Sequence, residues 1–218
     1  MDDVRVEPGG ISDYDALARH HYRAGRPAVP AAVLRAVCGD ATVGVLVVAM
    51  PVLNGPWRLR AWPGWLDAAD KRASAEAINA QVRTIARLVV APALRSRGVG
   101  CALVRAYLAA PLTARTEALA AMGAICPVFE RAGMRRVEFP PSRAALGLAR
   151  ALAAAGVRPW MLADPCTRRR VAESPPVRGA LKALAADRWR QGRCAPAREQ
   201  MERLWVHVAS RPVAFVAG

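Results

Sequence analysis

Thr84 to Leu108 reads TIARLVVAPALRSRGVGCALVRAYL, and this stretch decides how the chain folds. It begins inside a run from Val82 to Val90 that alternates and then becomes wholly apolar, as a buried β-strand does, and Pro92 ends that run. From Cys101 onwards the apolar side chains are spaced as they are in a helix. The stretch therefore predicts a strand, a turn rich in arginine and glycine, and a helix in direct succession.

The turn Arg95-Ser96-Arg97-Gly98-Val99-Gly100 has the composition of an anion site. Backbone N–H groups at a helix N-terminus have no partner within the helix, and the helix dipole is positive there. Glycine leaves room for an anion to approach the backbone, and Arg95 and Arg97 add charge. The turn is not a Rossmann motif, because its glycines are too few, nor a Walker loop, because no Gly-Lys-Ser/Thr follows. We expect it to bind the pyrophosphate of a donor substrate.

Strand and helix signals alternate on both sides of this stretch. The β-branched segment 42–50 carries no charge, as is typical of a central strand. Ser12 opens a capping box and with it a first helix. The remaining expected elements are a short helix around 33–37, strands at 57–62, 113–122 and 134–139, a loop with a helix in 65–79, and a short helix at 127–132. The alternation predicts an α/β domain over residues 1–140.

The composition changes in residues 141–218, which are rich in alanine, leucine and arginine and are interrupted by prolines. They carry 14 basic and 5 acidic residues, so we expect a basic helical extension. Its basic runs suit contacts with phosphate groups of a nucleic acid, although most such runs are only solvated surface. The expected nucleic-acid-binding residues are Arg168, Arg169, Arg170, Arg188, Arg190 and Arg193.

The whole chain of 218 residues has a formal net charge of +15, and nearly all of its basic residues are arginine. Arginine binds phosphate in a bidentate way, which favours a polyanionic partner, DNA in particular. A high-GC genome also enriches arginine and alanine, but it would supply acidic residues as well. The chain starts without a signal-peptide pattern and contains no apolar run long enough to cross a bilayer, so the sequence predicts a cytoplasmic protein without membrane contact. Its five cysteines form no Cys-x-x-Cys pair and give no zinc or disulfide signal.

Two segments together carry a family resemblance. The strand and turn from Thr84 to Gly100, followed by Cys126-Pro127-Val128-Phe129-Glu130-Arg131-Ala132-Gly133-Met134, resemble the GNAT acetyltransferase superfamily in order and spacing. The resemblance covers roughly residues 1–140. It implies a GNAT fold with a mixed central sheet splayed around the pantetheine arm of acetyl-CoA or another acyl or aminoacyl donor. The donor would contact Leu88, Val89 and Val90 and the turn Arg95, Ser96, Arg97, Gly98, Val99 and Gly100.

Phe129 departs from the pattern of that family. Many of its members have a tyrosine there, which is thought to protonate the leaving thiolate. A phenylalanine cannot donate a proton. Either water or another residue does so, or the donor and the chemistry differ.

A narrower resemblance points to nucleic-acid modification. The segments Leu17–Arg23, Ala86–Val90 and Glu117–Met122 are similar to the Mom-type DNA-modification branch, and to the acetyltransferase-like domain fused to ABC-type ATPases. Mom proteins modify the N6 amino group of adenine in DNA, and a His-Tyr pair belongs to their active site. Here that pair would be His21 and Tyr22.

The candidate catalytic residues are His21, Tyr22, Glu117 and Arg87. His21 would act as a base or metal ligand and Tyr22 as a proton donor or ligand, or both rings simply pack on the sheet. Glu117 lies in an apolar strand where burying an unpaired carboxylate is costly, so it either faces solvent or has a partner. Pairing with Arg87 would give it a structural role, whereas a raised pKa would make it a general base. We expect His21, Tyr22 and Glu117 to converge on one cleft.

Three functions fit these residues. The first is a Mom-like acyltransferase that modifies an amino group of a nucleic-acid base, with adenine N6 in DNA favoured. The second is an ordinary acetyl-CoA-dependent N-acetyltransferase acting on a protein or a small amine. The third is a nucleic-acid-binding module that keeps the fold without the chemistry. The sequence leaves open the acyl group, the metal content and the oligomeric state.

Overall fold

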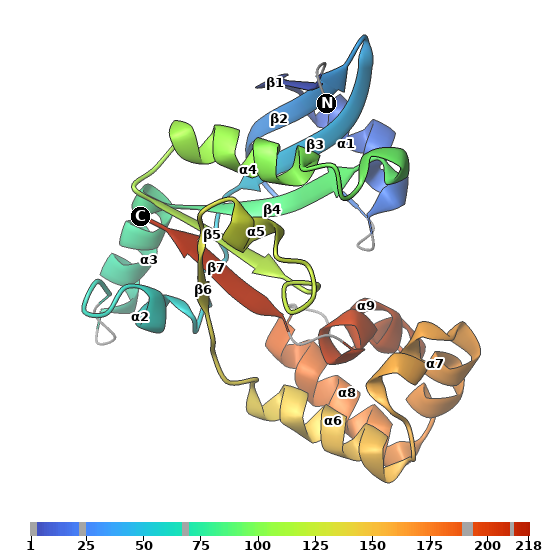
Figure 1. Ribbon diagram of the computed structural model, residues 1–218. Helices are drawn as coiled ribbons and strands as arrows, with labels where there is room; N and C mark the ends of the chain where they lie inside the picture. The colour runs from blue at the N-terminus through green and yellow to red at the C-terminus, as the bar shows by residue number, and fades with distance from the viewer. Residues whose placement is uncertain (1–3, 22–24, 67–69, 189–193, 210–211) are drawn as a thin grey trace. The chain divides into compact units, whose positions relative to one another are not determined.

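The stretch that opened the sequence analysis folds as predicted. Strand β4 (Val82–Val90) runs through a 3₁₀ turn, η2 (Pro92–Leu94), into helix α4 (Val99–Ala109). The computed structural model describes residues 4–21, 25–66, 70–188, 194–209 and 212–218 (Figure 1). The chain forms two units, one made of residues 1–139 with 213–218 and the other of residues 140–212.

The first unit is built on a seven-stranded mixed sheet with the order β1-β2-β3-β4-β5-β7-β6. Only β4 and β5 pair in parallel, and all other neighbours are antiparallel. The other strands are β1 (Val4–Pro8), β2 (Pro30–Cys38), β3 (Ala41–Ala49), β5 (Arg115–Ala120), β6 (Arg135–Val137) and β7 (Val213–Ala217). The expected α/β architecture is confirmed.

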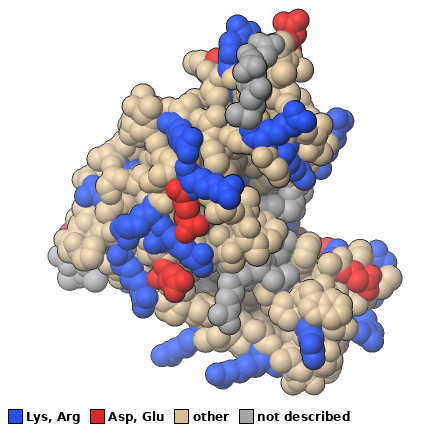
Figure 2. All heavy atoms as spheres, viewed as in Figure 1, with Lys and Arg blue, Asp and Glu red and all other residues tan. Residues whose placement is uncertain are grey.

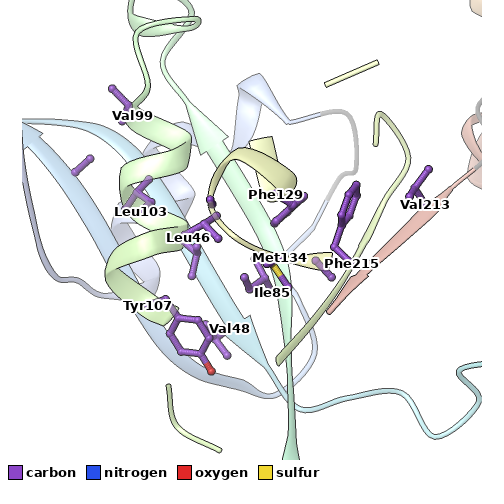
Figure 3. Close-up of a cluster of buried hydrophobic side chains, with 14 of the residues drawn as sticks. Leu46, Val48, Ile85, Val99, Leu103, Tyr107, Phe129, Met134, Val213 and Phe215 are labelled. Carbon is purple, nitrogen blue, oxygen red and sulfur yellow. The ribbon is translucent and has the colours of Figure 1, made fainter. Parts of the chain in front are cut away.

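Successive side chains of a strand point to opposite sides of the sheet, so the largely apolar β3 puts apolar side chains on both faces. Helices cover both faces. Leu46 and Val48 of β3 pack under α4 (Figure 3). Leu103, on the side of α4 that faces the sheet, is fully buried in the same cluster. Val45 and Val47 pack instead under helix α1 (Ile11–Leu17). Helix α5 (Val128–Arg131) joins the α4 face, whereas helix α2 (Arg58–Ala61) packs on the α1 face near β7.

Two predicted elements were wrong. Residues 33–37, expected as a short helix, lie in β2, because pairing with both β1 and β3 overrides the helix preference of alanine, leucine and arginine. Residues 57–62, expected as a strand, contain α2: Trp57 and Ala61 are four positions apart and both are buried. Helix α3 (Lys71–Gln81) follows, capped by the Asp70 side chain, within the segment where a loop with a helix was expected.

The second unit is helical and has a core of its own. Its elements are α6 (Arg143–Ala154), the 3₁₀ turn η3 (Pro159–Ala163), α7 (Pro165–Ala172), α8 (Pro175–Arg188) and α9 (Ala197–Ala209). Leu148, Leu162, Leu181 and Leu184 are fully buried within it. The extension does not stay helical to its end, because residues 213–217 form β7 between β5 and β6. The helical unit is thus an insertion between two strands of the first unit.

Candidate functional site

The sheet opens between β4 and β5. The two strands pair from Val82 opposite Arg115 to Ile85 opposite Ala118, and no further. Beyond that point β5 continues beside β7 while β4 continues beside β3, and Figure 1 shows the two strands fanning apart. A bulge at Ala86 marks the start of the divergence, since Ile85 pairs with Val48 but Arg87 pairs with Val47.

The turn after β4 contains a row of backbone N–H groups that no described protein group accepts from. Ser96 and Gly98 both have left-handed backbone conformations, with φ of 64° and 83°. Gly98 is the N-cap of α4, and no side chain caps it. Within the described part of the chain, no acceptor contacts the N–H groups of residues 96–101. Such a row of free amides at a helix N-terminus, in a turn of this shape, suits an anion.

The two glycines of the turn have different roles. Gly98 needs its left-handed conformation, and nothing lies within 4 Å of the place a Cβ would occupy. A Cβ on Gly100 would lie 3.1 Å from Cγ2 of Val128, so that glycine lets α4 pack against α5. Gly100 thus has a packing role in addition to the expected one, and its contact with a donor stays a prediction.

Arg95 ties the turn to the segment after α1. Its Nε donates to the carbonyl of Val90 at 3.2 Å, and its Nη2 donates to the carbonyl of His20, also at 3.2 Å. His20 ends the 3₁₀ turn η1 (Ala18–His20) that follows α1. The sequence-predicted His21 is therefore held one residue from a direct contact with the expected donor turn. Arg97 is exposed.

Arg87 lies at the bulge, on the α1 face, and is 8% exposed. Its guanidinium donates to the Tyr14 hydroxyl at 3.3 Å, to the carbonyl of Ala86 at 2.8 Å and to the carbonyl of Gly25 at 3.4 Å. The Tyr14 hydroxyl itself donates to the carbonyl of Gly25 at 2.9 Å. Arg87 thus connects β4 to α1 and to the chain that follows α1.

Glu117 has a different partner from the one expected. Its carboxylate accepts from Arg58, at 2.9 Å from Nε and 2.6 Å from Nη2, and not from Arg87. The Trp57 indole and the Thr84 hydroxyl each donate at 2.8 Å, and the glutamate is 0% exposed. Four donors occupy both oxygens, which leaves Glu117 well placed to hold α2 on the sheet and poorly placed to take a proton from a substrate. Sequence reasoning missed Arg58, because its segment was taken for a strand.

The expected convergence of His21, Tyr22 and Glu117 on one cleft stays a prediction. Arg95 donates to the carbonyl of His20, next to His21, whereas the hydrogen-bond partners of Glu117 are Arg58, Trp57 and Thr84. Tyr22 lies outside the described residues.

Phe129, at the position where a proton-donating tyrosine was considered, is 7% exposed. Its ring stacks on Phe215 with centroids 5.2 Å apart (Figure 3). Among the donor residues expected on β4, Leu88 and Val90 contact the core of the α4 face, and Val89 packs on the α1 face.

The expected nucleic-acid residues divide into two kinds. Arg168 is 9% exposed and donates to the carbonyls of Leu162 and Ala163 and to Glu202, so its expected role as a phosphate ligand was wrong. Arg169 and Arg170 are exposed on the last turn of α7. Arg190 and Arg193, and the side chain of Arg188, lie outside the described residues. On the face shown in Figure 2, basic side chains outnumber acidic ones over both units.

Comparison with models of known protein families gives no match, and neither does comparison with curated protein sequences. Within the described ranges, no helix combines the length and the apolar character needed to cross a bilayer. The same residues contain no group of three His, Cys, Asp or Glu side chains placed to hold a metal ion.

Proposed function

We propose that this chain is a GNAT-type acyltransferase that binds acyl-coenzyme A, or a related phosphate-bearing acyl or aminoacyl donor, at the turn Arg95–Gly100. The observation that carries the proposal is the row of free amides at residues 96–101, which follows directly on the strand that has parted from β5. The turn can hold a pyrophosphate, and the opening beside β4 suits an extended arm reaching into the sheet. The mixed, splayed sheet agrees with the fold that the resemblance implies.

The reaction proposed is acyl transfer to an amine. The amine nitrogen forms a bond to the acyl carbon, the bond from that carbon to the donor sulfur breaks, the amine gives up a proton and the thiolate takes one. Both carboxylate oxygens of Glu117 already accept hydrogen bonds, so Glu117 is poorly placed to take the proton from the amine. Phe129 has no proton to donate to the thiolate. We assign the role of base to His21, as the resemblance to the Mom-type branch implies, with water as the acid.

For the acceptor we propose the amino group of a nucleic-acid base, with adenine N6 in DNA favoured. The net charge of +15 and the exposed Arg169 and Arg170 support a polyanionic partner. A base in a duplex would have to be flipped out or presented single-stranded before its amino group could react. Mass spectrometry of nucleosides from cells that express the chain tests this acceptor directly. An acylated adenine nucleoside is expected, and its absence alongside intact donor binding would exclude the base as acceptor.

The donor site is tested by changing Gly98 to Asp and titrating coenzyme A by calorimetry. Asparagine and aspartate tolerate the left-handed region, so the fold should survive, while a carboxylate is placed among the amides. We expect the affinity for coenzyme A to fall about 10- to 100-fold. Gly39→Asp is the matched control, because Gly39 also has positive φ, 58°, and open space around it, but lies in the hairpin between β2 and β3. Equal affinities in the two variants would rule out the turn.

A second candidate is a nucleic-acid-binding module without catalysis. Two observations favour it. Both oxygens of Glu117 are taken up by hydrogen bonds within the protein, and Phe129 packs on Phe215 where a proton-donating tyrosine was considered, so neither residue is placed to transfer a proton. This module would shift DNA in a gel yet neither bind coenzyme A nor modify nucleosides. An ordinary N-acetyltransferase would do the reverse, binding the donor without a shift of nucleic acid.

A further inference from the structure

Arg87 is a buried cation for which the described residues supply no counter-ion. Three described arginines are less than a tenth exposed: Arg58, Arg87 and Arg168. Arg58 pairs with Glu117 and Arg168 with Glu202, but no carboxylate of the described residues lies within ion-pair distance of Arg87. Its three acceptors are neutral, and two of the three hydrogen bonds are 3.3 Å or longer.

A charge in this setting is costly unless something neutralises it. Buried charges are ordinarily paired, because water no longer solvates them. A guanidinium has five N–H groups, and Arg87 uses one on Nε, one on Nη1 and one on Nη2. One N–H on each terminal nitrogen is therefore left without a described acceptor. Two such donors are the number that a bidentate contact with a carboxylate or phosphate requires.

The position of Arg87 gives such an anion a place in the molecule. The residue lies at the bulge where β4 begins to part from β5, and it faces α1. Its neighbour Leu88 points to the opposite face, under α4. Arg87 donates to the carbonyl of Gly25, and Arg95 donates to the carbonyl of His20 at the end of η1.

We propose that Arg87 is an oxyanion-binding residue that takes a phosphate or carboxylate group on the α1 face of the sheet, separate from the turn Arg95–Gly100. Resting on the proposed acyl transfer, the occupant is an acidic group of the acceptor, since the donor phosphates belong at the turn. A nucleotide acceptor brings a phosphate, whereas a small amine acceptor brings a carboxylate. In either case Arg87 orients the acceptor and completes its own neutralisation.

The test uses the full chain and simple anions. Thermal unfolding is followed with increasing potassium phosphate or potassium acetate, against potassium chloride at equal ionic strength. An anion that binds the folded state raises the melting temperature. The variants are Arg87→Met, Arg87→Gln, Arg97→Glu in the donor turn, and Arg5→Met, which removes an exposed arginine of β1 and so matches the loss of one positive charge.

We expect the apparent anion affinity to fall about 10- to 100-fold in Arg87→Met and Arg87→Gln, and to stay unchanged in Arg5→Met. Arg97→Glu should weaken only the part of the phosphate response that the donor turn contributes, and the part that depends on Arg87 should remain. Loss in Arg97→Glu with retention in the Arg87 variants would assign the anion to the turn and overturn the proposal. So would the absence of any anion-specific effect on the parent chain. If both Arg87 variants fail to fold at every anion concentration, the guanidinium is a structural cross-link and the proposal is again overturned.

Comparing the two anions identifies the source of the group. A response to phosphate but not acetate indicates a nucleotide acceptor, which a tighter affinity for deoxyadenosine 5′-monophosphate than for deoxyadenosine would support. A response to acetate indicates a carboxylate-bearing amine. Coenzyme A titration is run in parallel, so that a chain that fails to bind coenzyme A but keeps its Arg87-dependent anion effect would sink the acyltransferase and leave the oxyanion site standing.

Discussion

Two buried arginines on the α1 face of the sheet have opposite surroundings. Arg58 is 1% exposed and meets the carboxylate of Glu117 through two hydrogen bonds, with Trp57 and Thr84 completing the cluster. Arg87 is 8% exposed and meets only a hydroxyl and two carbonyls. Arg58 shares its partner Glu117 with Thr84 of β4, whereas Arg87 belongs to β4 itself. At Thr84 that strand is still paired with β5, and at Arg87 the pairing has ended.

This difference separates a group that holds the fold from one that is ready to bind. The donors and acceptors around Arg58 and Glu117 satisfy one another, so nothing there calls for a ligand. Among the described residues, none pairs a negative charge with Arg87, and Arg87 lies where β4 parts from β5. In the sequence, Glu117 stood out because it is a charged residue in an apolar strand. In the structure, Glu117 is paired, and Arg87 is the buried charged residue that no described carboxylate pairs with.

The largest effect is expected from breaking the Arg58 cluster. Arg58→Met leaves the Glu117 carboxylate buried with only Trp57 and Thr84 as donors, and removing one partner of a buried pair costs about 3–5 kcal/mol. Chemical denaturation measures the loss. Changing both Arg58 and Glu117 to Met should recover most of it, because apolar residues of similar volume can replace a buried pair. If Glu117→Gln keeps full stability but abolishes acyl transfer, Glu117 is a general base after all.

The sequence predicted the elements around β4 and α4 because their signals are local. An apolar run, a proline, a glycine turn and a helical spacing occur within 25 residues there. Strand β2 was missed because its sequence suits a helix and only its two neighbours in the sheet make it a strand. Strand β7 was missed because an entire helical unit separates it from β6, the strand beside which it pairs.

The candidate site was predictable in the same uneven way. The donor turn is contiguous, so its residues could be named from sequence. The partner of Glu117 lies 59 residues away, in a segment assigned to the wrong kind of element, and no local pattern connects the two. Arg87 pairs with no carboxylate of the described residues, and no local pattern could predict this, because it depends on how the whole fold places those carboxylates.

A smaller effect is expected at Arg168, the third buried arginine, which tests whether pairing with a carboxylate marks a structural role. Arg168→Met leaves the carbonyls of Leu162 and Ala163 without a donor, which should destabilise the helical unit by about 2 kcal/mol. Amide hydrogen exchange within α7 and α9 would report the change.

The neighbouring exposed arginine supplies the control for Arg168. Arg169→Met should leave hydrogen exchange unchanged and, if the surface binds DNA, reduce the log–log salt slope by roughly 0.9. Equal destabilisation by the two variants would contradict the distinction between a buried and a surface arginine.

Acid should loosen the helix that carries Tyr14. Asp13 accepts from the Gly10 amide at 2.8 Å, from the Thr42 hydroxyl at 3.0 Å and from Arg35 at 3.3 Å. Burial acts to raise the pKa of Asp13, but these hydrogen bonds and the charge of Arg35 together lower it below the ordinary 3.8. A lowered pKa in the folded state means that this stabilisation is present above the unfolded pKa and is lost as the pH falls through the folded value.

Stability should therefore fall below about pH 4 in the parent chain. Asp13→Asn should lose about 1 kcal/mol at pH 7 and show a flatter acid limb. Denaturation midpoints at pH 7 and pH 3 measure both. An acid limb as steep in the variant as in the parent would exclude Asp13 as the titrating group.

Among the three buried arginines, the smallest loss of stability is expected at Arg87, which contrasts most sharply with Arg58. Arg87→Met removes hydrogen bonds to Tyr14 and Gly25, which costs stability, but it also removes a buried charge that nothing neutralises, which restores some. These two effects oppose each other, so we expect a net loss of about 1 kcal/mol or less in chloride buffer. Phosphate should then stabilise the parent more than the variant and widen the gap, because the anion supplies the missing counter-charge. A loss in chloride as large as that of Arg58→Met would place both arginines among the structural groups, and the contrast between a closed and an open site would disappear.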